Sequence, residues 1–596
     1  MPFDGITIRA LCRELNSDLL DSRIDKVHQP EKDEIVLSTR GLRTGSLKLL
    51  ISVNARWARM HISNEKKKNP ARPPAFCMLL RKYLEGGKIK EIKQVDFERI
   101  VHIRIEALDD FRDWKDKLLI CEFMGRHSNI ILLDPESNLI IDAIKKYGSN
   151  LSSYREVLPG KTYISPPDQQ KLNPLNSDFD EFVRFLWNQG EDKNLASAIF
   201  NVYSGISPFS AKEICRATGI ESETPAHECG DYELSKIYDY INKLLKNING
   251  GSLEAVVCYD NKQAWDFAPY PLSIFSESTI CKSYPSINAA CDRFYQDKLK
   301  LIRLESMRNN LNRKLKGYLD KAYKKQFHQE SDRVKALEND KYRIWGELLT
   351  AYAHQYSKGD TEVVLDDFYS GDKISLQLDP RYTPIQNAQR YFKIYNKSRK
   401  ALLHLENLMA KNQEEIDYLE SVMLSIQLAE NPAEIQDIAE ELEKEGYSRG
   451  ISHKAKSGKI QFSPRKFLSS DGIEILAGRN NRQNDILTLK EAKKTDLWLH
   501  SKDIPGTHVI VRLSGSINSI DELPDSTLEE AATLAAYFSK ARQSEKVPVD
   551  YTYRSNVRKP AGAKPGIVIY DKYWTIIARP NPDYLDRLLN SEIKPE

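Results

Sequence analysis

Residues 391–427 read YFKIYNKSRKALLHLENLMAKNQEEIDYLESVMLSIQ, and this stretch decides the architecture of the chain. Mostly apolar side chains recur in it at steps of three and four residues, which aligns them along one stripe of an α-helix. A stripe that keeps this period along the whole stretch predicts a coiled-coil seam. The expected seam positions are Tyr391, Ile394, Ser398, Leu402, Leu405, Met409, Asn412, Ile416, Leu419, Met423 and Ile426.

A second, less regular stripe precedes this one and predicts the partner helix. Between the two arms lies a block of short strand-like runs that contains Pro380 and Pro384. We therefore expect an antiparallel hairpin with coiled-coil arms at 286–341 and 386–445 and a small inserted middle domain at 342–385. The stripe of the first arm consists of Ile287, Cys291, Phe294, Leu301, Leu311, Leu315, Tyr318 and Ala322.

The first arm is also strongly basic. Two interpretations remain open for this pattern, a solvated helix face or a local surface for a polyanion. The basic residues are Lys298, Lys300, Arg303, Arg308, Arg313, Lys314, Lys316, Lys321, Lys324 and Lys325.

Residues 1–172 show the pattern of a β-rich domain. An amphipathic helix is expected at 7–20, and a second helix follows Pro73 and Pro74. The close spacing of the strand-like runs favours a β-sandwich or a split barrel. The expected strands are 24–28, 34–39, 47–53, 58–62, 89–97, 100–105, 118–124, 129–133 and 139–144.

Residues 173–250 change to a helical pattern that includes GISPFSAKEICRATGI at 205–220. Gly205 and Pro208 predict a tight turn into a helix that starts near Phe209. Such a turn is either a phosphate site at a helix N-terminus or a plain interhelix turn. Residues 251–285 then return to strands as a connector.

The C-terminal part predicts a compact α/β domain at 446–580, followed by a tail at 581–596. Its first residues, 446–459, have the composition of a loose basic linker. A helix is expected at 526–543. Strands are expected at 475–476, 509–512, 549–553, 567–569 and 575–577.

Composition sets limits on the class of protein. A chain of 596 residues predicts about three to five domains, and 88 basic against 85 acidic side chains give a net charge of only +3. No apolar run approaches the roughly 20 residues that cross a bilayer, and the N-terminus does not resemble a signal peptide. Eight cysteines without a CxxC motif predict reduced, buried thiols, so we expect a cytoplasmic protein without membrane contact.

The sequence contains none of the common motifs for metal binding or nucleotide hydrolysis. The 11 histidines are dispersed, and neither paired CxxC, HExxH nor a glycine-rich phosphate loop occurs. We therefore expect no metal site and no cofactor. Pro2 leaves one enzymatic alternative open, because an N-terminal secondary amine could attack an aldehydic sugar carbon, as in DNA glycosylases of the formamidopyrimidine type. Those enzymes carry a glutamate where this chain has Phe3, and their four-cysteine zinc finger has no counterpart here.

Several segments together resemble the NFACT family in the same order along nearly the whole chain. The resemblance implies a glycosylase-like N-terminal domain, a helix–hairpin–helix-type domain, the coiled-coil hairpin and a C-terminal NFACT-R domain. The fold class expected is therefore multidomain α+β. The segments are MPFDG at 1–5, RIDKVHQPEKDEIVL at 23–37, FERI at 97–100, EFMGRHSNIILLD at 122–134, GISPFSAKEI at 205–214, SSDGIEILA at 469–477 and KPAGAKPGIVIY at 559–570.

The resemblance implies a ribosome-associated quality-control factor rather than an enzyme. Family members bind a large (50S) ribosomal subunit that still carries a peptidyl-tRNA nascent chain, and they recruit alanyl-tRNA for untemplated alanine tailing. The ribosome makes the peptide bond, so no catalytic residue is expected in the chain itself. Further expected partners are a stalk-base ribosomal protein and a small heat-shock-type RNA-binding protein. A matrix-binding adhesin, which older family names suggest, is the remaining alternative, and the expected absence of a signal peptide argues against it.

Motif by motif, the resemblance also implies tRNA-binding residues in the N-terminal half. The family's Asp-Arg pair corresponds to Glu98 and Arg99, where glutamate adds one methylene. The acidic Asp4 and Glu98 either accept from base amino groups, orient Arg99, or form salt bridges within the domain. His127 is either a structural cap or an RNA contact. The residues of this group are Asp4, Glu98, Arg99, Arg126, His127 and Asn129.

A second group comes from GRNNRQNDILTLKEAKKTDLWLHSKDIPGTHVIVR at 478–512, which is rich in amides and guanidiniums. Such groups contact phosphates, riboses and base edges without doing chemistry. Because LWLH alternates, Trp498 shares a face with His500, and its ring either stacks on a base or packs in the core. The expected tRNA-binding residues are Arg479, Asn480, Asn481, Arg482, Gln483, Asn484, Trp498, His500, Lys502 and His508, and the expected ribosome-binding residues are Lys314, Lys321, Lys324 and Lys325.

Overall fold

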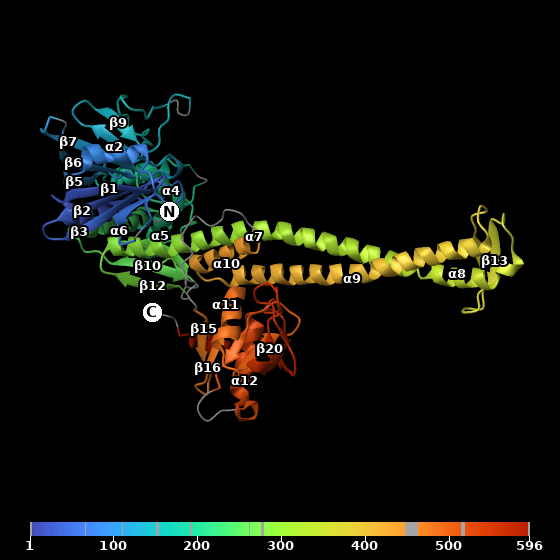
Figure 1. The fold of residues 1–596 in the computed structure, drawn as a ribbon. Helices are drawn as coiled ribbons and strands as arrows, with labels where there is room; N and C mark the ends of the chain where they lie inside the picture. Colours follow the sequence, from blue (N-terminus) through green and yellow to red (C-terminus); the bar gives the residue numbers. More distant parts are fainter. Residues whose placement is uncertain are drawn as a thin grey trace. The chain divides into compact units, whose positions relative to one another are not determined.

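The computed structural model divides the chain into two compact units, residues 1–299 and 300–596 (Figure 1). The division falls inside the long helix α7 (Ile287–Glu338). Across the residues that the structure describes, no helix is both long and apolar enough to cross a membrane. Described are residues 3–65, 67–109, 111–150, 154–190, 193–260, 263–275, 279–447, 463–513 and 519–593.

The first unit is built on nine antiparallel strands in the order β4-β3-β2-β1-β5-β6-β7-β8-β9. β1 and β5 share only one register pair, Arg23 with Lys88, so the series divides there into a four-stranded and a five-stranded part. Every strand expected in this region is present. The strands are β1 (Arg23–Glu31), β2 (Glu34–Gly41), β3 (Gly45–Ser52), β4 (Arg59–Ile62), β5 (Lys88–Gln94), β6 (Ile100–Leu108), β7 (Trp114–Glu122), β8 (Asn129–Asp134) and β9 (Leu139–Ala143).

Helix α1 (Gly5–Leu19) buries its apolar stripe in the main core of this unit. It begins two residues earlier than the apolar pattern predicted, because Asp4 caps it by accepting a hydrogen bond from the Thr7 N–H at 3.0 Å. Helix α2 (Ala75–Leu84) follows Pro73 and Pro74 as expected and also contributes to this core.

A group of helices follows the sheet, as the change of pattern predicted. Side chains of Asp178, Asn194 and Ser207 cap three of them, each by accepting from the backbone three residues on. The helices are α3 (Phe179–Trp187), α4 (Leu195–Val202), α5 (Pro208–Thr218) and α6 (Asp231–Gly250), with a 3₁₀ turn at Ala226–Glu228.

The connector forms a three-stranded sheet of β10 (Ala255–Asp260), β11 (Gln263–Ala268) and β12 (Ile280–Tyr284) in the order β11-β10-β12. Cys258 and Cys281 are register partners on β10 and β12 and form a disulfide. The expectation of reduced thiols is therefore wrong for this pair. The two cysteines are 23 residues apart in the sequence, and no motif indicates that their strands are neighbours. The six other cysteines are free and buried.

In the second unit, α7 and α9 (Pro384–Leu428) run side by side in opposite directions (Figure 1). Three contacts establish the antiparallel order, because the α9 partner moves back along the chain as α7 advances: Tyr323 with Glu420, Gln326 with Gln413, and Asn339 with Ser398. The seam is a core of leucines and other apolar side chains, which include Leu311, Leu315, Ile416 and Leu419.

The second arm ends earlier than expected. Helix α9 stops at Leu428, and residues expected to continue it form a separate helix, α10 (Pro432–Lys444), whose Ile435 and Ile438 pack into the seam core. The signal was present, because Asn431 caps α10 and Pro432 occupies its first turn. The tip holds α8 (Lys341–Ala351), a 3₁₀ turn at Ala353–Gln355, and a hairpin of β13 (Glu362–Asp366) and β14 (Lys373–Gln377).

The C-terminal domain is a six-stranded sheet in the order β15-β16-β18-β17-β19-β22, with α12 (Asp525–Tyr537) packed on one face. The sequence missed β15 and α11, and α13 lies within the expected tail, where Leu588 joins the core. The other elements are β15 (Arg465–Leu468), β16 (Glu474–Ala477), α11 (Asn481–Ile486), a π-helical turn (Leu487–Glu491), β17 (Leu497–Ser501), β18 (Val509–Val511), β19 (Val547–Tyr553), β20 (Val557–Arg558), β21 (Ile569–Tyr570), β22 (Trp574–Ala578) and α13 (Leu585–Asn590), with 3₁₀ turns at Ile520–Glu522 and Arg554–Asn556.

Candidate functional site

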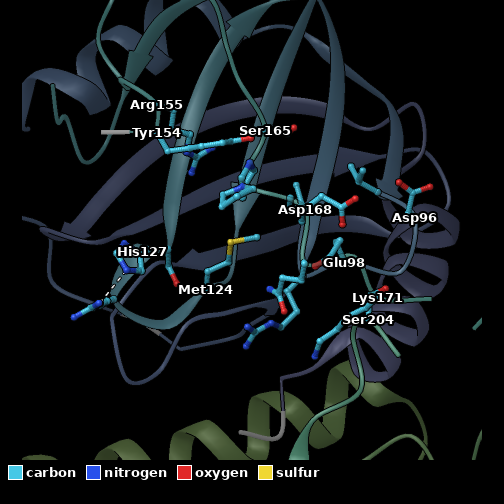
Figure 2. A pocket seen from close by; sticks show the side chains of 18 of the residues that line it. Asp96, Glu98, Met124, His127, Tyr154, Arg155, Ser165, Asp168, Lys171 and Ser204 are labelled. Carbon is cyan, nitrogen blue, oxygen red and sulfur yellow. Dashed lines mark hydrogen bonds between the residues drawn. The ribbon is translucent and has the colours of Figure 1, made fainter. Parts of the chain in front are cut away.

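A pocket of about 970 Å³ in the first unit brings together four of the residues expected to bind tRNA: Glu98, Arg99, Arg126 and His127 (Figure 2). Its walls come from the turn between β5 and β6, the turn between β7 and β8, and the segment after β9. The remaining lining residues are Val95, Asp96, Ile100, Met124, Ser128, Lys145, Tyr147, Tyr154, Arg155, Ser165, Pro166, Pro167, Asp168, Gln169, Lys171, Asn173 and Ser204.

The β5–β6 turn fixes the backbone of Glu98 and Arg99. Gln94, buried at the end of β5, donates from its side-chain amide to the carbonyl oxygens of Glu98 and Gly5, at 3.0 Å each. The Phe123 N–H donates to the Arg99 carbonyl at 2.8 Å. Both side chains of the pair are half-buried, so their polar ends reach the pocket from a backbone that is held on two sides.

Burial raises the pKa of the Glu98 carboxyl, while the neighbouring Arg99 and Lys171 lower it. Figure 2 shows Glu98, Asp168 and Lys171 on one side of the pocket and His127 on the other. A carboxylate beside two cations can accept a hydrogen bond from a base amino group and can also orient the guanidinium.

Two lysines that the sequence did not single out add to the positive charge. Lys145 donates to the Val53 carbonyl and Lys171 donates to the Phe200 carbonyl, each at 2.6 Å. Burial lowers the pKa of both ammonium groups. The backbone bonds leave each ammonium with further donors, which a phosphate or a carbonyl of a ligand could accept.

Asn129, expected to contact tRNA, instead positions Lys145. Its side chain is fully buried, and its amide donates to the Lys145 carbonyl at 2.9 Å. Its carbonyl oxygen accepts from the backbone N–H groups of Ile130 and Lys145, both at 3.0 Å. The amide therefore ties the start of β8 to the segment that carries the lysine.

Arg126 and His127 lie exposed on the turn after β7, where Gly125 adopts a φ of +59°. The Arg126 Nε donates to the His127 Nε2 at 2.9 Å. His127 does not cap this turn, whose cap residues are Met124 and Ser128, so the structure does not support the alternative of a structural cap. Among the described residues, neither Arg99 nor Arg126 forms a salt bridge, and both guanidiniums keep donors for a ligand.

A buried ion pair supports the opposite wall. Arg155 donates to both Glu122 oxygens at 2.7 and 2.6 Å, and the Tyr163 hydroxyl donates to the same carboxylate at 3.0 Å. Because Glu122 is fully buried and bonded by all these donors, this cluster holds the wall rigidly.

The lining carries five cations and three carboxylates: Arg99, Arg126, Lys145, Arg155 and Lys171 against Asp96, Glu98 and Asp168. Arg155 is paired with Glu122, so four cations remain against three carboxylates, and such a set can hold an anion that carries hydrogen-bonding groups, such as a nucleotide. Within the described part of the chain, no cluster of three or more histidines, cysteines or carboxylates has metal-ligand geometry. Pro2, on which the lyase alternative depends, lies outside the described residues.

Asp4 is not in this pocket and has a structural role. Besides capping α1, its buried carboxylate accepts from the Ser210 hydroxyl at 2.5 Å and lies 3.4 Å from the Ser207 N–H at the start of α5. The Asp4 carboxylate therefore lies at the start of α5, where a phosphate would bind, and this favours a plain interhelix turn over a phosphate site. Gly205, with a φ of +70°, lies so close to Gly5 and Phe97 that a Cβ there would be 2.0 Å from the Phe97 carbonyl oxygen.

The amide-rich segment of the C-terminal domain lies mostly in the interior, contrary to its expected exposure to RNA. Asn480 caps α11 by accepting from the Gln483 N–H at 2.9 Å. Asn484 accepts from the Thr507 hydroxyl and the His508 N–H at 3.1 and 3.2 Å. Amides in a polar segment look alike in sequence whether they bind a ligand or the backbone of their own loop. The buried members of the group are Asn480, Asn481, Gln483, Asn484, Trp498 and His508.

Arg479 and Arg482 of this segment face acidic side chains of α10. Arg479 donates to Glu434 at 3.0 Å and to Glu592 at 3.1 Å, so its expected charge for RNA is neutralised. Burial raises the pKa of the Asp437 and Glu441 carboxyls, and the charge of the half-buried Arg482 offsets part of that rise. These partners lie far away in sequence, and no local pattern could have revealed them.

Trp498 adopts the core alternative. Its side chain is 0 % exposed and packs with Leu476, Leu487, Ile510 and Val557, while Leu497 and Leu499 face the other core as the alternation predicted. His500 stacks on its ring with centroids 5.8 Å apart. Lys502 is half-exposed and lies 3.9 Å from Asp550.

The lysines expected to bind the ribosome are exposed on α7. Lys314, Lys321, Lys324 and Lys325 all face solvent, as a surface for a polyanion requires.

Comparisons with known proteins agree with the resemblance in the sequence. The family description "NFACT N-terminal and middle domains" matches residues 4–461, and "NFACT protein RNA binding domain" matches residues 463–571. The Rqc2 homolog RqcH of Bacillus subtilis is 35% identical over 599 residues, covering 99% of this chain and 100% of that protein. The protein of the same name from Streptococcus suis is 37% identical over 585 residues, with coverage of 98% and 99%. A solved N-terminal part of a fibronectin/fibrinogen-binding protein from Streptococcus suis is 31% identical, covers 50% of this chain and 100% of its own, and has a TM-score of 0.41. Because both family descriptions match in order and the relatives align along nearly the whole length, this chain belongs to the NFACT family.

Proposed function

We propose that this protein is a ribosome-associated quality-control factor that binds tRNA on stalled large ribosomal subunits. It engages a 50S subunit that carries a peptidyl-tRNA, recruits alanyl-tRNA, and supports untemplated addition of alanine to the nascent chain. Support comes from the names of its relatives, which include "Ribosome quality control complex subunit 2" of Schizosaccharomyces pombe. Further support is the family's RNA-binding domain over residues 463–571.

The observation that carries the proposal is the pocket of the first unit. Glu98 and Arg99, which correspond to the family's acidic-basic pair, lie in one cavity with Arg126, Lys145 and Lys171. An unpaired base can donate to the carboxylate while its phosphates contact the cations. A cavity of about 970 Å³ has room for such a group.

The protein acts by binding and positioning. The pocket residues are donors and acceptors without an activated nucleophile, and the ribosomal peptidyl-transferase centre forms the bond. The lysines of α7 contact the large subunit, and the separate binding surfaces hold one tRNA in a productive position. A stalk-base protein and a small heat-shock-type RNA-binding protein are further partners in this scheme.

Affinity purification of the full chain from its own cells, followed by sequencing of the RNA, tests the proposal. We expect free large-subunit rRNA and one enriched tRNA species, an alanine tRNA. A mock purification from cells that lack the tagged chain serves as the control. Recovery of neither large-subunit rRNA nor any enriched tRNA contradicts the proposal.

A further inference from the structure

A second cavity, of about 460 Å³, lies between α9 and the C-terminal domain. It is separate from the pocket of the first unit, and its lining has the opposite charge. Two carboxylates, Asp417 and Asp503, line it, and no lysine or arginine is among its described lining residues. The complete set is Gln413, Asp417, Tyr418, Ser421, Asn481, Trp498, His500, Asp503, Ile504, Pro505, Gly506, His508, Gly566, Ile567, Val568 and Tyr570.

Aromatic rings form much of this lining. The His500 ring lies nearly parallel to the buried Trp498 ring, at 13°, and the Tyr570 ring centroid is 4.8 Å from that of Trp498. His500 is only partly buried, so it is the ring of this stack that a ligand can reach. Burial lowers the pKa of both His500 and His508, and both rings therefore stay neutral near pH 7.

The polar groups of the cavity come from two directions. One face of α9 presents Gln413, Asp417 and Ser421 at successive intervals of four residues, which align them along the helix. Asp503 approaches from the turn after β17, where it adopts a φ of +50° that suits an aspartate. Both carboxylates are exposed, so their acceptor atoms remain accessible to a ligand.

The aromatic rings and the two carboxylates of this cavity together favour one class of ligand. Because the lining holds two carboxylates and no lysine or arginine, an uncharged group fits inside this cavity better than a phosphate. A flat ring fits next to His500, and amino and imino donors on its edge fit the carboxylates. The volume is that of a nucleoside-sized group.

We propose that this cavity binds a single unstacked nucleobase of RNA, with guanine favoured, whose ring stacks on His500 and whose amino edge donates to Asp503. Guanine is favoured because its N1–H and N2–H₂ are adjacent donors that match one carboxylate, whereas uracil offers a single imino donor. The phosphates remain outside the cavity. The inference rests on RNA binding by this chain, as in the proposed function.

Binding of short RNA probes to the full-length chain tests the inference. Labelled UUGUU and UUUUU are compared by fluorescence anisotropy, and free guanosine and uridine are compared by calorimetry. We expect UUGUU to bind at least about tenfold more tightly than UUUUU. Guanosine distinguishes a base within RNA from a free nucleoside. If guanosine binds and the oligonucleotides do not, the cavity is a free-nucleoside site and the RNA assignment is overturned.

Three variants assign the contacts. Removal of the ring in His500→Ala should weaken UUGUU binding by about tenfold, and His500→Phe should restore it to within about threefold, since stacking needs a ring and not an imidazole. Asp503→Asn should abolish the preference for guanine, whereas Asp583→Asn, which changes an exposed carboxylate of the same domain outside the cavity, should not. Unchanged binding in both His500→Ala and Asp503→Asn overturns the inference. Binding of an arginine amide in place of guanosine also overturns it, because the cavity would then be a site for a cationic side chain.

The outcome is separable from that of the proposed function. If the chain shows no preference for guanine but still recovers tRNA, only this inference is contradicted. A retained preference without tRNA or large-subunit recovery removes only the proposed function.

Discussion

At the scale of single residues, the pocket of the first unit depends on where two neighbouring side chains stand. Glu98 and Arg99 lie half-buried on one turn, and the carboxyl has a pKa that burial raises and Arg99 lowers. The two side chains form no salt bridge with each other in the described structure, so the guanidinium donors and the carboxylate acceptors both remain available in the pocket. Relative to the aspartate that the resemblance implies for the family, Glu98 keeps a carboxylate acceptor and adds one methylene of reach.

Arg99→Ala should abolish alanine tailing and leave 50S association largely intact, because Arg99 belongs to the pocket that we propose binds tRNA, whereas we assign the subunit contact to the α7 lysines. Arg99→Lys, which keeps the charge and loses the fork geometry, should retain a fraction of the activity. Tailing is measured on a stalled reporter, and 50S association by sedimentation. Equal loss of both would mean that Arg99 supports the fold.

Asn129→Ala should lower the free energy of unfolding by about 1–3 kcal/mol, because it leaves buried backbone groups of Ile130 and Lys145 without partners. Urea denaturation of the full chain provides the measurement. Asn150→Ala, at an exposed asparagine of the following segment, serves as the control and should change the midpoint little. A neutral Asn129→Ala would contradict the positioning role.

Sequence reasoning chose four side chains that share the pocket of the first unit, but it also chose amides of the C-terminal domain that the structure buries, and both outcomes have a common physical reason. Arg126 and His127 occupy a turn between two strands, and turns leave side chains exposed. Asn480 caps α11 and Asn484 lies within it, and their side-chain oxygens accept from the start of the helix and from the residue before β18. Lys145 and Lys171 had no motif around them, and only the folded chain brings them to Arg99.

At the scale of elements, α10 carries the attachment of the C-terminal domain. Its Glu434 pairs with Arg479, and its buried Glu441 accepts from the Tyr418 hydroxyl at 3.0 Å. Burial raises the pKa of Glu441 to about 7. The apolar period revealed both long helices, and the break between α9 and α10 was signalled separately by Asn431 and Pro432 at the start of α10.

The protein should lose stability as pH rises from about 4.5 to 7, by an amount traceable to Glu441. The folded state holds a proton on this carboxyl that the unfolded state releases near its ordinary pKa, so the folded state binds more protons in that window and unfolding becomes easier as pH increases. Glu441→Gln should remove this component and be more stable than the natural chain at pH 8, by about 2 kcal/mol. Thermal unfolding at pH 5 and pH 8 measures it. A variant that is less stable at both values would show that the ionised carboxylate stabilises the fold.

Asn412→Leu should raise the melting temperature of the second unit. Asn412 is fully buried in the α7–α9 seam, where its amide donates to the Ala322 carbonyl at 3.0 Å and its own oxygen has no partner among the described residues. A buried polar residue at a seam position sets register at a cost in stability. Calorimetry of the full chain measures the change, and a lowered transition would contradict it.

At the scale of the whole molecule, charge is local and not global. A net charge of +3 over 596 residues gives little general attraction to RNA. The cations instead gather in the pocket of the first unit and along α7. The α7 group can be recognised in the sequence, because consecutive turns of one helix carry it. The pocket cations come together only when the β5–β6 turn, the β7–β8 turn and the segment after β9 fold next to one another.

Replacement of Lys314, Lys321, Lys324 and Lys325 by alanine should weaken 50S binding and flatten its salt dependence. Each lost phosphate contact reduces the slope of log K against log salt by about 0.7–0.9, which predicts a change of about 3 for all four. A variant with Lys393, Lys397, Lys400 and Lys411 replaced has the same net charge and serves as the control. An equal change in both variants would mean that the effect is not specific to α7.

Helix α7 has a consequence for how this protein can be cut. The division between the two compact units falls between Leu299 and Lys300, well inside a helix that continues without interruption to Glu338. Proteases cleave extended backbone, and a helical peptide at the junction offers none. A protease should therefore not separate the two units at their boundary. Cleavage between them would require an engineered protease site.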